Sequence, residues 1–192
     1  MHINDAEIAR RAALLANDYD GILPQFVPFY LFSVLYCADR ANSAFSIFEK
    51  EKRSSNPVAL TSAVHEALGH SAALSRFFWP TKNKGVAAAR AKKLRTILHV
   101  GDESPLKDRS LRNSLEHFDE RLDEYLLTYD AGYFFPAPMI GSHTLADEPV
   151  GRIFKLVDSD NNVIVILGQK CHFRPIKGEV ERILNLVRPL TE

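Results

Sequence analysis

The chain has 192 residues, of which 46% are hydrophobic and 25% charged, a composition typical of one globular domain with a sizeable core. Its 24 basic and 24 acidic residues cancel, which excludes a strong overall field for nucleic acid or membrane lipid, so any electrostatic steering must be local. Two cysteines, Cys37 and Cys171, are too few for a disulfide framework or a metal ribbon and fit a reducing compartment.

The start of the chain and its most apolar segment bear on localisation. The first twenty residues include Asp5, Glu7, Asp18 and Asp20 and do not have the basic start and apolar run of a secretory signal. The most apolar segment, residues 22–37, contains two prolines and is shorter than the roughly 20 residues that cross a bilayer. We therefore expect a cytoplasmic protein with no membrane partner.

Helical signals dominate the first half of the chain. Asn4 or Asp5 is expected to cap a first helix that ends near Gly21. A second helix is predicted from Pro28 to Phe48, and its aromatic density is typical of a core. A third is predicted from Val58 to Phe78, before Pro80.

Two further helices are predicted before residue 130. The Ala-rich segment around residues 82–95 has high helix propensity, and Gly101 is expected to close it. Ser104 as cap and Pro105 at the first position would open the fifth helix. Its apolar residues recur at spacings of three and four, the pattern of a core-facing stripe: Leu111, Leu115, Phe118, Leu122 and Tyr125.

The pattern changes after Tyr129. Residues 152–157 and 163–167 read as two strands joined by a tight turn at 158–162, and a last helix is predicted from Pro175. We therefore predict a mainly α protein: an antiparallel helical bundle over residues 1–130, then a loop, a β-hairpin and a C-terminal helix over residues 131–192, packed on the bundle.

The fifth helix carries an uncommon polar cluster beside its apolar stripe. Arg112 and Asn113 are followed by His117, and a separation of five residues turns Arg112 and His117 about 140° apart on a helix. This Arg-Asn-x-x-x-His pattern in a long helix of a helical bundle resembles the R-x4-6-H motif of the HEPN superfamily. The resemblance covers mainly residues 55–130.

The resemblance implies a face-to-face homodimer and, in many members, a metal-independent endoribonuclease of a toxin-antitoxin or defence system. Carried onto this chain, His117 would act as general acid or base, since an imidazole exchanges protons near neutral pH. Arg112 would hold the phosphate, and Asn113 would orient the histidine or the phosphate. The expected partners are RNA, a second copy and an antitoxin or regulatory protein.

A second reading is a HEPN-like module with no catalysis, whose polar cluster fixes a dimer interface or binds a nucleotide. An arginine and a histidine beside an apolar stripe are also common on plain helix surfaces, where Glu116 can pair with Arg112. The many carboxylates near His117 would repel a phosphate backbone, which favours this alternative.

Other polar residues are candidates for substrate binding. On the third helix, His65 and His70 are one residue too far apart for the zincin pattern, so no metal is expected, and His70 and Arg76 are assigned instead to the RNA site. The basic stripe of residues 82–95 is a candidate phosphate track through Lys92, Lys93 and Arg95. The sequence has no P-loop, nucleophile elbow or Rossmann fingerprint, and no cofactor is expected.

Overall fold

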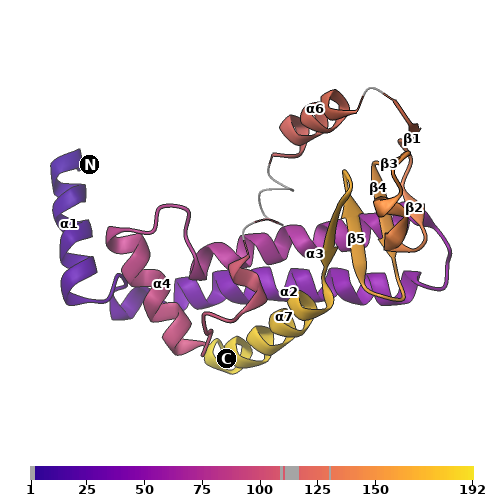
Figure 1. The fold of residues 1–192 in the computed structure, drawn as a ribbon. Coiled ribbons are helices and arrows are strands. Elements are labelled where there is room, and N and C mark those ends of the chain that lie inside the picture. Colours follow the sequence, from indigo (N-terminus) through magenta and orange to yellow (C-terminus); the bar gives the residue numbers. More distant parts are fainter. Residues whose placement is uncertain (1–2, 109, 111–116, 130) are drawn as a thin grey trace.

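A long helical hairpin forms the body of the protein. In the computed structural model, which describes residues 3–108, 110, 117–129 and 131–192, helix α2 (Val27–Glu51) is followed by α3 (Pro57–Phe78), and the two lie side by side (Figure 1). The Asn56 side chain caps α3 by accepting from the Val58 and Ala59 amides, and Pro57 occupies its first turn. The predicted second and third helices are therefore confirmed.

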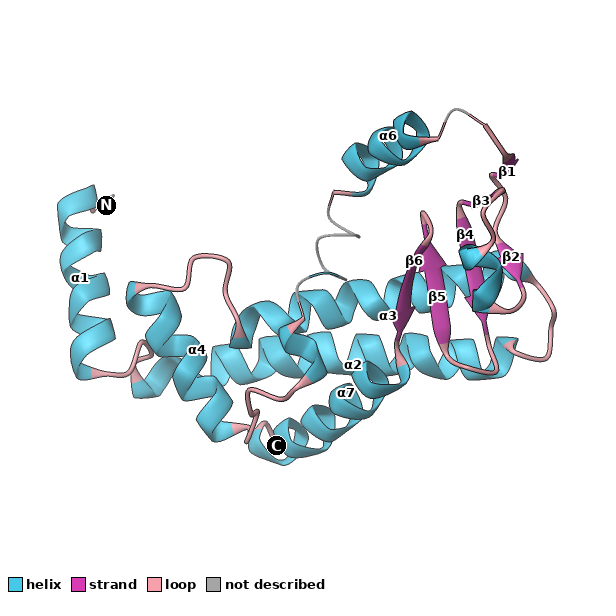
Figure 2. Ribbon diagram, in the orientation of Figure 1, coloured by secondary structure: helices cyan, strands magenta, loops and turns pink. Residues whose placement is uncertain are grey.

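Two shorter helices pack together at one end of the hairpin. Helix α1 (Asp5–Asp18) begins after Asn4, whose side chain accepts from the Glu7 amide, as predicted. It contacts α4 (Gly85–Ile97) (Figure 2). The end of α4 is set by His99 at φ +48° rather than by Gly101, because the left-handed conformation lets the Val100 amide donate back to Arg95.

The C-terminal helix completes the main core. Helix α7 (Arg174–Val187), predicted from Pro175, packs along α2. Phe173, just before it, is fully buried, and its ring lies 6.0 Å from the Phe45 ring and 5.1 Å from the Phe48 ring. Residues from both halves of the chain thus form one hydrophobic cluster.

A small sheet covers the far end of the hairpin, next to α3. The predicted hairpin is confirmed as β4 (Lys155–Asp158) and β5 (Val163–Ile166), which pair antiparallel with Leu156 opposite Val165. The predicted first strand, residues 152–157, is wrong as one continuous element, because residues 152 and 153 belong to a separate strand pair. Two strands that the sequence pattern missed extend it to the order β2-β4-β5-β6: β2 (Met139–Ile140) and β6 (Gln169–His172). A separate parallel pair consists of β1 (Tyr133–Phe135) and β3 (Gly151–Ile153).

The predicted fifth helix is wrong at its start. Residues Pro105–Lys107 form a single 3-10 turn, and Asp108 is extended with ψ 121°. The Ser104 hydroxyl does not cap a helix because it donates to the Glu179 carboxylate of α7 at 2.7 Å. The helix that the structure describes, α6 (Phe118–Thr128), lies apart from the long helices (Figure 1).

The aromatic face of α2 is also different from the prediction. Phe29, Phe32 and Tyr36 are 70%, 54% and 62% exposed, so they do not belong to the core. The buried stripe of α2 is instead made largely of smaller residues such as Val34, Ala38 and Ala41. The structure therefore shows a mainly helical protein with a small sheet, and its main core lies between the α2–α3 hairpin and α7. Within the described residues, every helix is too short or too polar to traverse a bilayer.

Candidate functional site

His117 is the one member of the predicted catalytic group that the structure describes; Arg112 and Asn113 lie outside the described residues. His117 was expected inside a helix, but its φ of −113° and ψ of 40° place it immediately before α6. Its side chain is 57% exposed, and its Nδ1 lies 3.4 Å from an oxygen of Glu120. The imidazole is therefore accessible, with one carboxylate beside it.

The residue after His117 attaches this end of α6 to the sheet. The Phe118 ring meets the Phe154 ring edge to face at a centroid distance of 5.6 Å. The Lys155 ammonium lies 4.8 Å from the Phe118 centroid and 5.1 Å from the Phe154 centroid. Burial lowers the pKa of Lys155 from its ordinary value. No sequence signal marked Lys155, because it lies almost forty residues from His117.

Helix α3 contributes a histidine to the same region. Burial lowers the pKa of His65, and the positive charge of Lys155 lowers it further. His65, Lys155 and the His117-Phe118 pair thus come from α3, β4 and the start of α6. The arrangement offers one exposed imidazole, one ammonium group and one largely neutral imidazole, which are groups that bind anions and move protons.

The other predicted residues of α3 have partners of their own. His70 Nε2 lies 4.0 Å from a Glu66 oxygen, and its ring meets the Tyr36 ring of α2 edge to face at 6.3 Å. Glu66 also accepts from Arg40 at 3.3 Å. Arg76 is exposed in the last turn of α3 and also has an interaction partner. These contacts place His70 on the aromatic face of α2 and α3.

Two of the three predicted phosphate-binding residues of α4 are engaged within the protein. The Lys93 ammonium donates to the carbonyl oxygens of Tyr19 and Ile22 at 3.0 and 3.1 Å. Arg95 donates to Asp102 at 2.9 Å and lies 5.8 Å from the centre of the Trp79 ring. Lys92 is exposed. An RNA track along this helix stays a prediction, and Lys92 is its most accessible member.

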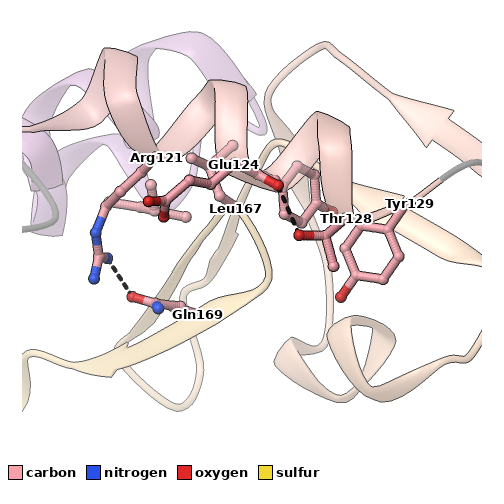
Figure 3. A pocket seen from close by; sticks show the side chains of 8 residues that line it. Arg121, Glu124, Thr128, Tyr129, Leu167 and Gln169 are labelled. Atoms are coloured by element: carbon pink, nitrogen blue, oxygen red, sulfur yellow. Dashed lines mark hydrogen bonds between the residues drawn. The ribbon is translucent and has the colours of Figure 1, made fainter.

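A small pocket lies where α6 meets the β5–β6 turn (Figure 3). Arg121 of α6 donates to the Gln169 side chain at 2.5 Å, and the Thr128 hydroxyl donates to the Glu124 carbonyl oxygen at 2.7 Å. The cavity has a volume of about 180 Å³, and Tyr129 lies at its edge. The Arg121–Gln169 hydrogen bond joins α6 to β6, whereas the Thr128–Glu124 bond lies within the helix, so this pocket contributes to the positioning of α6.

A second histidine cluster, which the sequence pattern did not mark, is built around a buried carboxylate. Asp158 is 5% exposed. Its carboxylate accepts hydrogen bonds from the backbone amides of His143 and Asn161, both at 3.0 Å, and from Asn161 Nδ2. The His143 Nδ1 atom lies 2.7 Å from the Asp158 Oδ2 atom. Burial alone would raise the pKa of Asp158, but the hydrogen bonds outweigh it and hold the pKa well below its ordinary value. Asn161 is a partner from the same turn, whereas His143 lies fifteen residues earlier in the chain, so the carboxylate joins this turn to the segment that carries His143.

Neither cysteine has the properties of a nucleophile. Burial raises the pKa of the Cys37 thiol, and burial together with the Asp108 carboxylate raises the pKa of the Cys171 thiol to about 11. Among the described residues, no three His, Cys, Asp or Glu side chains are grouped so that they could hold a metal ion. The candidate chemistry is therefore centred on His117.

Comparisons of the chain with protein-family models, with curated proteins and with solved structures gave no match.

Proposed function

We propose that this is a HEPN-like protein that acts on RNA as a metal-independent endoribonuclease, with His117, Arg112 and Asn113 at its centre. The observation that carries the proposal is the accessible His117 imidazole at the start of α6, within an Arg-Asn-x-x-x-His pattern. A toxin-antitoxin or defence setting, a cytoplasmic location and an antitoxin or regulatory partner are the corresponding biological expectations.

The chemistry needs only groups that the chain supplies. The ribose 2′-hydroxyl attacks the neighbouring phosphorus, and the bond from phosphorus to the 5′ oxygen breaks. One imidazole removes the proton of the 2′-hydroxyl or gives a proton to the leaving oxygen, and Arg112 stabilises the charge on the phosphate. A homodimer would supply the second imidazole. The products are a 2′,3′-cyclic phosphate and a 5′-hydroxyl.

Two features near His117 support anion binding at this point. The His117 side chain does not cap α6, and the first amides of a helix attract negative charge. Lys155 lies next to Phe118 on the same side of the molecule. Both favour a phosphate close to the imidazole.

The proposal is tested by incubating the purified protein with a fluorescent single-stranded RNA in the presence of a metal chelator. We expect cleavage by the wild type, loss of at least a hundredfold in rate for His117→Ala and Arg112→Ala, and no cleavage of the DNA of the same sequence. His172→Ala, at an exposed histidine of β6, is the matched control and should cleave normally. Equal rates for wild type and a folded His117→Ala protein would disprove the catalytic role.

The alternative function is a non-catalytic HEPN-like module whose polar cluster fixes a dimer interface or binds a nucleotide. The contact of His117 with Glu120 favours it, because Asp119 and Glu120 in the first turn of α6 repel a phosphate backbone. In this case no RNA is cut, expression does not arrest growth, and Arg112→Ala changes the oligomeric state measured by light scattering.

A further inference from the structure

An apolar pocket lies between α6 and the strand pair β1–β3, and one guanidinium group lines it. Leu122, Tyr125 and Leu126 of α6 form one wall, and Phe134 and Phe135 of β1 form another. Arg152 of β3 lies opposite Phe134 in the register of the strand pair. The volume of about 280 Å³ is close to the lower end of small-molecule pockets, roughly 300–1,000 Å³.

In the part of the chain that the structure describes, no other segment covers these apolar walls. Leu126, Phe134 and Phe135 remain 50%, 46% and 41% exposed, and every residue of β1 is exposed. Phe134 and Phe135 both line the pocket, and Phe134 is the one in register with Arg152, so its exposed ring offers a surface on which a planar group can stack beside the guanidinium.

Arg152 is the charged group of this pocket, and its environment is unusual. Its Nε atom is buried and has no hydrogen-bond partner among the described residues, and none of their carboxylates forms an ion pair with it. The guanidinium carbon lies 3.7 Å from the centre of the Tyr129 ring, which holds the cation in place from one side. Because Nε is enclosed, an anion would meet the terminal nitrogens of Arg152, which form no hydrogen bond with the described residues, and a guanidinium binds phosphate oxygens through these groups.

The pocket is connected to the proposed catalytic end of α6. Leu122, one of the lining residues, lies five residues after His117 and within α6. Phe154, which lines the pocket, also contacts the ring of Phe118. One strand of RNA can therefore pass both places, with neighbouring nucleotides at each.

We infer that this pocket binds one unpaired nucleotide of a single-stranded RNA, with its base against Phe134 and a phosphate on Arg152. This inference rests on RNA being the substrate, as proposed above. The walls offer few polar groups that distinguish one base from another, so stacking and charge dominate and the site tolerates any base. The pocket holds the strand next to His117.

The test measures binding rather than cleavage, with His117→Ala as the background so that the RNA stays intact. The probe is a ten-nucleotide single-stranded RNA that carries 2-aminopurine, whose fluorescence falls when it stacks on an aromatic ring. We expect Phe134→Ala and Arg152→Gln each to raise the Kd about tenfold. Phe134→Ala should also abolish the fluorescence change, and Arg152→Gln should reduce the slope of log K against log salt by about one.

Matched controls come from other parts of the surface. Phe32→Ala removes an exposed ring from α2, and Arg53→Gln removes an exposed charge from the α2–α3 turn, so both should bind like the background protein. If Arg152→Gln and Arg53→Gln bind equally well and the fluorescence change survives Phe134→Ala, the inference is overturned. Binding of benzoate or inorganic phosphate with no binding of RNA overturns it as well.

The two proposals fail separately. Pocket-dependent RNA binding without any cleavage by the wild type would remove the catalytic role of His117 and leave the nucleotide site. Cleavage that depends on His117, with binding unchanged by both pocket variants, would remove the nucleotide site and leave the catalytic role.

Discussion

Asp158 illustrates what a single buried residue contributes to this fold. Its carboxylate joins the turn of the β4–β5 hairpin, through Asn161, to the loop that carries His143. The sequence predicted this turn, because the Asp and Asn residues among positions 158–162 are residue types that favour tight turns. It did not predict His143 as a partner, because that contact spans fifteen residues and depends on how the preceding loop folds.

The lowered pKa of Asp158 makes its contribution to stability dependent on pH. The contribution is fully present above the pKa of an unfolded aspartate, near 4, and is lost as the pH falls through the lower folded value. We expect Asp158→Asn to lower the free energy of unfolding by about 2–3 kcal/mol at pH 7, because hydrogen bonds to a charged acceptor are lost. The difference from the wild type should shrink steadily below pH 4.

Urea denaturation at pH 7, 4, 3 and 2.5 measures this difference. Asp160→Asn changes an exposed carboxylate in the same turn and should leave stability within about 0.5 kcal/mol at every pH. If the difference in free energy of unfolding between Asp158→Asn and the wild type stays constant down to pH 2.5, the lowered pKa does not belong to Asp158.

The helices show which elements a sequence pattern defines. Asn4, Asn56 and the prolines at positions 57 and 175 mark helix starts through local chemistry, and these starts were predicted to within one or two residues. The short strands β2 and β6 have no such signal because only their pairing with neighbours defines them. The exposed aromatic face of α2 was wrongly assigned to the core, since a stripe that is apolar on several sides does not reveal which side is covered.

Of the candidate site, the sequence pattern proposed His117 but did not predict which residues surround it. Lys155, Arg152 and Phe134 take their places through the parallel pair of β1 and β3 and through the contact of α6 with the sheet. These contacts join segments that lie ten to forty residues apart, with loops between them, and periodicity carries no information about them.

The connection between α1 and α4 depends on one glycine. Gly21 has φ +81°, and a Cβ atom there would lie 2.2 Å from the Arg90 backbone nitrogen. Gly21→Ala therefore meets both an unfavourable conformation and a clash with the backbone of α4. We expect a loss of about 2 kcal/mol or more and faster proteolysis of α1, measured by thermal denaturation and limited trypsin digestion.

Gly178→Ala is the matched substitution for this prediction. Gly178 lies inside α7, and nothing approaches within 4 Å of a Cβ atom placed there. The alanine should stabilise the protein by about 0.5–1 kcal/mol, since it is the better helix former. Equal effects of the two substitutions would show that α1 and α4 do not pack as described.

At the scale of the whole molecule, distant parts of the chain share one core. Phe45 and Phe48 of α2 pack against Phe173, and the buried face of α7 includes Val180 and Ile183. The sequence predicted that the C-terminal helix packs on the helical part. It did not predict that α7 would fill the central position, because its apolar stripe fits several partners equally well.

Phe173→Ala tests whether the two halves unfold together. Removing a fully buried phenylalanine should cost about 3–5 kcal/mol, and a single cooperative transition should move as a whole. Urea denaturation followed both by circular dichroism and by the fluorescence of Trp79, on the N-terminal side, measures this. As a control, Leu127→Ala, at a side chain that is 87% exposed, should leave the free energy of unfolding almost unchanged. If the unfolding transition reported by Trp79 fluorescence does not shift in Phe173→Ala, the two halves do not share one core.

The late position of α7 in the chain has a consequence for biosynthesis. The ribosome makes α2 and α3 first and α7 roughly a hundred residues later, which takes on the order of 5–20 seconds at 5–20 residues per second. During that interval the apolar surface of α2 that later packs against Phe173 and α7 is exposed to solvent in the nascent polypeptide. We expect chaperones to bind these surfaces until α7 has been synthesised and packs on them.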